Sequence, residues 1–192
     1  MSGPRLFACL ALMLIAACAS SPKPQYYVLT PEKGSATSAS NASAPSIAVG
    51  PVTVPDLVDQ PRIVVQAEGN QVTMQEYQRW ASALPSEIAS VIVANLSQEL
   101  GSPRVWSYLQ SALPTPDVQV AINVRRFDAV LGQGVTLDVL WGIRRKPGQA
   151  VKTGQSVVHE PVSGGDINDL VAGYSRALAQ VSRDIARAIR TP

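Results

Sequence analysis

The sequence predicts one α/β domain of the mixed α+β kind, in which a mixed β-sheet is packed by two main helices. Three observations support this class: two long alternating apolar segments in the middle of the chain, two segments with helical apolar spacing, and no internal repeat. A period of two is typical of half-buried strands, and a period of 3.6 is typical of amphipathic helices. A chain of 192 residues has the length of one domain and can bury a core without a disulfide or a metal.

The N-terminal part of this domain is expected to hold two short strands separated by a loop. An aromatic and apolar run at residues 25–29 predicts the first strand, and residues 47–52 predict the second. Pro51 suggests that the second strand lies at a sheet edge or ends there, because proline cannot donate to a ladder. Residues 31–45 are rich in serine and alanine and show no periodicity, so they predict a flexible loop.

A hairpin and a helix are expected next. Residues 54–61 are punctuated by prolines and aspartates and predict a turn or a short helix. Residues 63–66 and 71–74 flank Gly69-Asn70, which is a good hairpin signal. After Pro85, apolar residues recur at helical spacing until a glycine and a proline end the helix. These apolar residues are Ile88, Val91, Ile92, Leu96 and Leu100.

Three further strands are expected to form an antiparallel meander. Residues 118–124 and 135–143 alternate between apolar and polar or small side chains. Gly132-Gln133-Gly134 lies between them and predicts the turn of a long hairpin. Pro147-Gly148 predicts a second turn, which leads into a third strand around residues 153–159.

The clearest element is a helix at the C-terminal end. Asp166 and Asp169 stand where an N-cap residue and its N3 acid belong. An apolar stripe at 3.6-residue spacing follows: Leu170, Tyr174, Leu178, Val181, Ile185 and Ile189. Four arginines cluster on the opposite face and form a candidate interaction face: Arg176, Arg183, Arg187 and Arg190. They could meet anionic headgroups or an acidic partner, although solvated helix faces show the same pattern.

The N-terminus predicts an exported lipoprotein. Residues 1–17 carry one positive charge and the apolar run Leu6–Ala17, which is too short for a bilayer core of about 30 Å and is typical of a signal peptide. The run ends Leu14-Ile15-Ala16-Ala17-Cys18, which matches a bacterial lipobox. We therefore expect cleavage between Ala17 and Cys18, with diacylglycerol and a further acyl chain such as palmitate on Cys18. The alternative is an ordinary signal peptide with an incidental cysteine.

Residues 18–24 would then be a lipidated tether in front of a single domain at 25–192. The six residues Ala19–Pro24 reach at most about 20 Å, so the folded body should stay close to its membrane. Two or three acyl chains suffice for stable anchoring. Ala19, in place of an aspartate, favours the outer membrane over the inner membrane of a Gram-negative cell. Cys9 would leave with the signal peptide, so the two cysteines are not expected to form a disulfide.

Composition disfavours nucleic-acid binding and catalysis. A formal net charge of +2 is too small for a protein that must neutralise phosphates along a nucleic acid. The single histidine, His159, precludes a multi-histidine metal centre; with Glu160 it could form an acid/base pair, but a surface histidine at a strand end is the simpler interpretation. No Gly-x-Ser-x-Gly elbow is present. We therefore expect no enzyme activity, no cofactor and no metal.

Three other patterns have a plain structural interpretation. Asp56 and Asp59 could hold a cation, but the flanking prolines favour turn-forming aspartates. Gly132-x-Gly134 lacks the third glycine and the following helix of a dinucleotide loop. The tryptophans could line a lipid pocket, but packing in a core or an interface is the default for large aromatic residues. They are Trp80, Trp106 and Trp141.

Several short segments follow the lipobox at Cys18 in a recognisable order. They are Tyr26-Tyr27-Val28-Leu29, Ile47-Ala48-Val49-Gly50-Pro51-Val52, Val54-Pro55, Leu57-Val58-Asp59-Gln60-Pro61-Arg62-Ile63-Val64, Arg79-Trp80-Ala81 and Tyr174-Ser175-Arg176-Ala177-Leu178-Ala179. Taken in this order, they resemble the ABC-type transport auxiliary lipoprotein family, the PqiC-like group associated with MCE-domain proteins. One departure is Gln60, where the family pattern has arginine before the proline.

This resemblance implies an outer-membrane lipoprotein that faces the periplasm and docks an MCE-type ABC lipid transport system maintaining envelope integrity. Its partners would be an MCE-domain protein with its inner-membrane transporter, and a homo-oligomer is also implied. The implied fold is the three-layer type of anticodon-binding-like and TolB N-terminal-like domains. Cys18 is the one residue that takes over a family function, while Gly50 and Pro55 would shape the backbone and Trp80 would seat the first helix. The alternative function is a periplasmic lipid carrier with its own apolar pocket.

Overall fold

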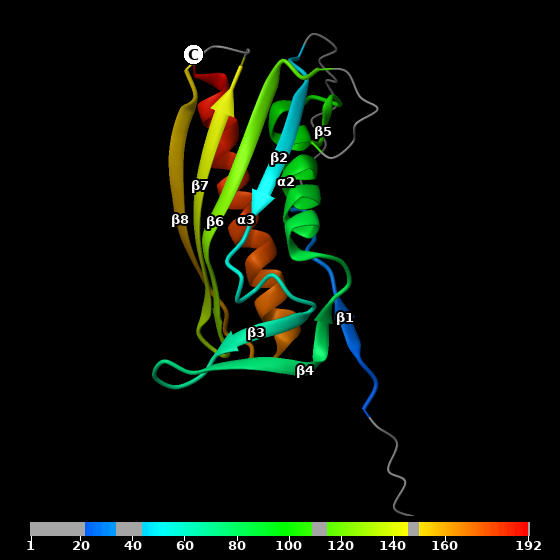
Figure 1. Ribbon diagram of the computed structural model, residues 1–192, viewed down its shortest axis with the longest axis vertical. Coiled ribbons are helices and arrows are strands. Elements are labelled where there is room, and N and C mark those ends of the chain that lie inside the picture. Colours follow the sequence, from blue (N-terminus) through cyan, green and yellow to red (C-terminus); the bar gives the residue numbers. More distant parts are fainter. Residues whose placement is uncertain (1–21, 34–43, 109–114, 146–149, 192) are drawn as a thin grey trace, which may run out of the picture.

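The computed structural model describes residues 22–33, 44–108, 115–145 and 150–191 (Figure 1). Within these ranges, one eight-stranded mixed sheet carries the helices α2 (Leu84–Leu100) and α3 (Ile167–Arg190) on one face. The predicted α/β domain with a mixed sheet and two main helices is therefore confirmed. The predicted signal peptide, Cys18, most of the predicted loop at 31–45 and the Pro147-Gly148 turn lie outside the described residues.

The predicted meander forms one side of the sheet. Strand β6 (Val118–Val130) pairs antiparallel with β7 (Gly134–Arg144), and β7 pairs antiparallel with β8 (Lys152–Pro161). The turn between β6 and β7 places Gly134 at φ +152°, where an added Cβ would lie 2.4 Å from the Glu160 carbonyl oxygen. This close approach explains why the hairpin needs glycine there.

The other edge of β6 is shared by two strands. Strand β2 (Ile47–Thr53) runs parallel to the first half of β6, and β3 (Arg62–Gln66) reaches its far end through the pair Gln66 and Val130. The sheet then continues outward from each of them. Strand β5 (Val105–Ser107) pairs parallel with β2, and β4 (Val72–Trp80) pairs antiparallel with β3.

Strand β1 (Gln25–Tyr27) adds to β4 in parallel and forms the edge at the lower end of the molecule (Figure 1). The chain thus brings its first strand beside a strand about fifty residues later, because the register pairs Tyr27 with Trp80. The Ala81 N–H then donates to the Tyr27 carbonyl oxygen at 2.8 Å. The N-terminal strand is therefore an integral part of the sheet.

One strand prediction holds in part and another needs correction. Pro51 lies inside β2 rather than at its end, in the register irregularity between Val49 and Val52. It follows Val49, the last residue of β2 that pairs with β5, so this part of β2 has a neighbouring strand only on the β6 side. Strand β4 extends to Trp80, well beyond the predicted end at Met74. The residues of β4 past Met74 are mostly polar and partly exposed, so they give no apolar alternation to read.

Both helices follow their sequence signals. The Asp166 carboxylate accepts a hydrogen bond from the Asp169 N–H at 2.9 Å and caps α3, while Gly101 at φ 60° ends α2 in the left-handed conformation. The apolar stripe of α3 is buried against the sheet. Because the helices lie side by side on one face, the described residues form two layers rather than the three that the family resemblance implied.

An aromatic cluster joins α3 to the strands β4 and β6. Phe127 and Tyr174 stack with ring centroids 3.8 Å apart, and Trp80 contacts both edge-on at 6.2 and 6.4 Å. The Tyr174 hydroxyl donates to the Phe127 carbonyl oxygen at 3.1 Å. Burial, with a smaller contribution from the Asp128 charge, raises the pKa of Tyr174 well above its usual value. Trp80 thus packs against the last helix, whereas the resemblance implied a role in seating the first.

Truncation of the α3 stripe should destabilise the domain strongly. Leu178 is 1% exposed, so Leu178→Ala removes buried methyl groups and leaves a cavity that costs about 2–5 kcal/mol. Leu131→Ala makes the same chemical change in the β6–β7 turn, where the side chain is 41% exposed, and should cost no more than about 0.5 kcal/mol. Urea unfolding of both variants measures the difference. Equal losses of stability would contradict this assignment of the core.

Candidate functional site

The N-terminal segment, defined as residues 25–33, is the candidate functional site because it joins the predicted lipid anchor to the folded body. Beyond β1, its backbone is bound by side chains of both helices. The Leu29 N–H donates to Glu87 of α2 at 3.1 Å, and the Thr30 N–H donates to Ser175 of α3 at 3.1 Å. Leu29 itself is buried in the core at 5% exposure. The segment therefore lies across both helices as part of the fold.

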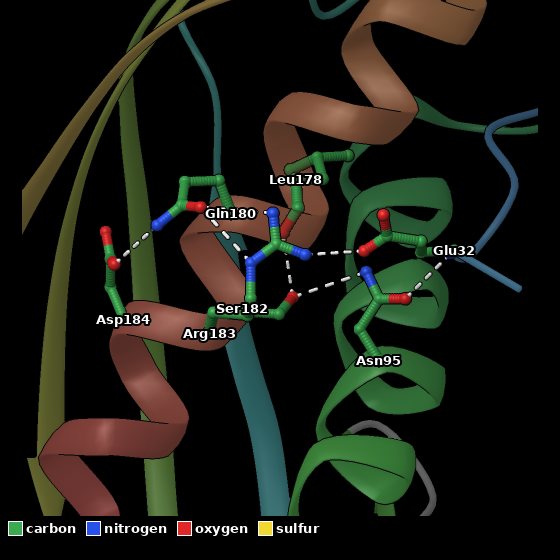
Figure 2. A network of polar contacts seen from close by, with 7 residues as sticks. All are labelled: Glu32, Asn95, Leu178, Gln180, Ser182, Arg183 and Asp184. Carbon is green, nitrogen blue, oxygen red and sulfur yellow. Dashed lines mark hydrogen bonds and ion pairs between the residues drawn. The ribbon is translucent and has the colours of Figure 1, made fainter. Parts of the chain in front are cut away.

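Glu32 completes this attachment (Figure 2). Its N–H donates to Asn95 Oδ1 of α2 at 3.1 Å, and its carboxylate forms an ion pair with Arg183 of α3 at 2.5 Å. Asn95 is buried, and its Nδ2 lies 3.4 Å from the Ser182 hydroxyl, which in turn donates to the Leu178 carbonyl oxygen at 2.8 Å. The buried polar groups of the helix interface are thus satisfied by one another and by the segment.

The same network continues to the sheet. Arg183 donates to the Gln180 side-chain oxygen at 3.1 and 3.0 Å, and Gln180 donates to Asp184 at 3.0 Å. Asp184 also accepts a 2.7 Å hydrogen bond from the buried Ser156 hydroxyl of β8. Trp141 of β7 donates to the same hydroxyl at 3.1 Å. A continuous chain of hydrogen bonds therefore links β7, β8, α3, the N-terminal segment and α2.

Tyr27 shows how closely the segment sits against the body. Burial, with a smaller contribution from the Asp166 charge, raises the pKa of the Tyr27 phenol. Its hydroxyl donates to the Gln25 side-chain oxygen at 2.9 Å. Asp166 is the N-cap of α3, so the first strand of the domain and the start of its last helix are close in space.

The comparisons with known proteins agree with this architecture. The model of the family described as ABC-type transport auxiliary lipoprotein component matches residues 27–186. The chain belongs to this family. The members of this family are lipoproteins, which are anchored to membranes. The matched range begins within β1 and includes the N-terminal segment from Tyr27 onward.

Two solved structures share the fold of this chain. A crystal structure of an uncharacterized protein has a TM-score of 0.71 and 23% identity, and covers 88% of this chain and 99% of its own. The Xanthomonas campestris protein XCC0632, described as a DUF330 protein, has a TM-score of 0.61 and 21% identity, with coverages of 88% and 93%. No curated protein matches the sequence.

Each arginine of the candidate interaction face is bound within the chain. Arg176 pairs with Glu160 of β8 at 2.5 Å, and Arg183 pairs with Glu32. Arg187 pairs with Asp184 one turn earlier, and Arg190 donates to the Glu99 carbonyl oxygen of α2. Three of them, Arg176, Arg183 and Arg190, therefore tie α3 to other elements. Arg187 has 69% of its side chain accessible, more than Arg176 or Arg183. A role in interaction stays a prediction for all four.

The structure separates the residues considered for catalysis. The ring nitrogen Nδ1 of His159 lies 3.1 Å from the Thr136 hydroxyl on the outer face of the sheet, whereas Glu160 turns to the other face to meet Arg176. Asp56 and Asp59 are exposed in the turn that Pro55 organises by accepting N–H bonds from Val58 and Asp59. Within the described ranges, no group of three potential metal ligands comes together.

The tryptophans do not converge on a pocket. Trp80 is buried in the aromatic cluster, while Trp106 on β5 and Trp141 on β7 are half-buried on separate strands. A cleft of about 120 Å³ lies between β2, α2 and β5, and none of the three tryptophans lines it. Gly50 forms part of its wall at φ +134°, where an added Cβ would lie 2.9 Å from the Tyr108 Cβ. Gly50 therefore shapes the backbone, as the resemblance implied.

The helix network was missed by sequence reasoning, although a signal for it exists. Asn95 lies seven residues after Ile88 in the apolar stripe of α2, and Ser175 and Ser182 lie seven residues apart beside the stripe of α3. A polar residue on an apolar helix face must be hydrogen-bonded. Its partner here is the N-terminal segment, and that pairing cannot be predicted from either helix alone.

Among the described residues, neither α2 nor α3 combines the length with the apolar composition that a membrane-spanning helix needs.

Replacing Asn95 should loosen the N-terminal segment. Asn95→Leu keeps the side-chain size but leaves the Glu32 N–H without its acceptor, which should cost about 1–3 kcal/mol. Hydrogen exchange at Glu32 should accelerate with it. Asn123→Leu is the matched control, because Asn123 bonds Thr53 on the exposed face of the sheet and should change stability by no more than about 0.5 kcal/mol. Unchanged exchange at Glu32 in Asn95→Leu would argue against the docking described here.

Proposed function

We propose that this chain is an outer-membrane lipoprotein, anchored through acyl groups on Cys18, that docks an MCE-type ABC lipid transport system on the periplasmic side. Family membership supports the transport and lipoprotein roles. The docked N-terminal segment supports the anchoring role, because its contacts with both helices leave only a short stretch of chain between the folded body and Cys18. The mechanism is positional: the anchor holds the domain at the membrane, and the domain surface captures the MCE protein.

A carrier function is less well supported by the same geometry. The cleft between β2, α2 and β5 has about 120 Å³, whereas sites that enclose small molecules have about 300–1,000 Å³. A phospholipid with two acyl chains would not fit in it. We therefore favour an adaptor that shortens the aqueous path of the lipid over a protein that carries lipid in this cleft.

Loss of Cys18 should release the protein from the membrane without unfolding it. Cys18 precedes the first described residue, Pro22, and the buried core of the described residues is formed without it. Cys18→Ser should therefore move the protein from the outer-membrane fraction to the soluble periplasmic fraction and impair detergent resistance of the cells. Cys9→Ser is the matched control, because Cys9 lies in the predicted signal peptide and its loss should change neither. Normal membrane fractionation of Cys18→Ser would refute lipid anchoring.

Partner capture can be tested on the exposed part of the candidate interaction face. Arg187→Glu reverses a charge on the outer side of α3 and should reduce recovery of the MCE protein several-fold after crosslinking in cells. Arg126→Glu is the matched control, since Arg126 has 55% side-chain exposure and a nearby aspartate partner, but lies on the sheet face away from the helices. Equal recovery with both variants would remove Arg187 from the interface. No recovery with the unsubstituted protein would contradict docking.

A further inference from the structure

Two arginines and a tyrosine form a row across three strands beside the predicted anchor. The register pairs Arg62 of β3 with Arg79 of β4, and Arg79 with Tyr26 of β1. Directly paired residues of neighbouring strands present their side chains on the same face. Ile63 and Trp80, which follow the two arginines, are buried in the core, so the row lies on the outer face of the sheet. Tyr26 is 64% exposed there.

The two guanidinium groups are not neutralised within the described residues. The described part of the chain offers neither Arg62 nor Arg79 an ion pair, and the Nε of Arg79 is buried without a hydrogen-bond partner. Like charges directly opposite each other destabilise a strand pair, and a buried donor without an acceptor costs further free energy. The other arginines on the middle of this sheet face, Arg125 and Arg126, each have an aspartate partner.

The row lies where the chain leaves for the membrane. The described chain begins at Pro22, and Cys18 is at most about 14 Å from it. Strands β1, β3 and β4 share the lower end of the molecule (Figure 1). Lys23 adds a further exposed cation to the stretch that enters β1. An exposed tyrosine next to cations is typical of a surface that meets the headgroup region of a bilayer.

We propose that Arg62 and Arg79 bind the phosphate of an anionic phospholipid in the membrane that holds the anchor, with Tyr26 against the headgroup region. The inference rests on the proposed lipidation of Cys18 and deepens it. Paired guanidinium groups suit phosphate because each presents several N–H donors in a planar fork. A bound phosphate would screen the repulsion between the two side chains. The domain would then rest on the bilayer in one orientation.

The test uses the lipidated full-length mature chain in vesicles, after intact-mass measurement has verified the acyl groups. Val28 is exposed just beyond β1, and Val28→Cys would introduce the only free thiol, because Cys18 is acylated. A polarity-sensitive fluorophore on this thiol reports contact with the headgroups. Its emission should be brighter in phosphatidylcholine vesicles with phosphatidylglycerol than in phosphatidylcholine alone. The double substitution R62Q/R79Q should lower the ratio of apposed to free domain about 30-fold.

The matched control is Arg144→Gln. Arg144 is an exposed arginine on the same outer face, without an ion pair among the described residues, but at the end of β7 farthest from β3. It should leave the response unchanged. The proposal is overturned by equal emission in both vesicle types, by an unchanged response in R62Q/R79Q, or by an equal response to inorganic phosphate in neutral vesicles. A negative result in a verified lipidated chain refutes the headgroup site alone, whereas a chain without acyl groups refutes the anchor and this inference together.

Discussion

The docking of residues 25–33 onto β4, α2 and α3 is the constraint on which the rest of the account depends. From Cys18 to Gln25 the chain reaches at most about 25 Å, whereas from Cys18 to Ile47, the first residue of β2, it could reach about 100 Å. The contacts of Leu29, Thr30 and Glu32 with the helices decide between these two lengths. With the shorter length, an acyl anchor on Cys18 would hold the domain against the membrane. With the longer length, the domain could move up to about 100 Å away from it.

The docking of the N-terminal segment stabilises the domain because it provides hydrogen-bond partners for polar side chains that the helices bury. Asn95 lies 3% exposed between α2 and α3, where an unpaired amide would be costly. The Glu32 N–H supplies a donor to it, and Arg183 binds the carboxylate of the same residue. Arg183, Gln180 and Asp184 continue the chain of hydrogen bonds to Ser156 of β8. The N-terminal segment is therefore joined to the sheet as well as to the helices. The ion pair itself is partly exposed and contributes little by itself.

Local patterns predicted most of the fold and little of this site. The β6–β7–β8 meander and the stripe of α3 carry strong periodicity, so their type and approximate position follow from the sequence. Strand β5 has three residues, too few to alternate, and the pairing of β1 with β4 depends on residues about fifty positions apart. The same holds for Glu32, which stood in a segment predicted as a flexible loop. Its partners, Asn95 and Arg183, lie on two different helices. The serine- and alanine-rich composition of residues 31–45 indicates only that they form no regular helix or strand. It contains no information about side chains on distant helices that bind the backbone of Glu32.

The height of the domain above the bilayer tests the central claim most directly. Neutron reflectometry of the lipidated chain on a supported bilayer gives the thickness of the solvent layer between the headgroups and the protein. A docked N-terminal segment predicts a protein layer that begins no more than about 25 Å from the headgroups, because the chain from Cys18 to Gln25 cannot reach farther even when fully extended. A diffuse protein layer that extends well beyond this distance would show that residues 25–33 are not held by the helices, and would contradict the account.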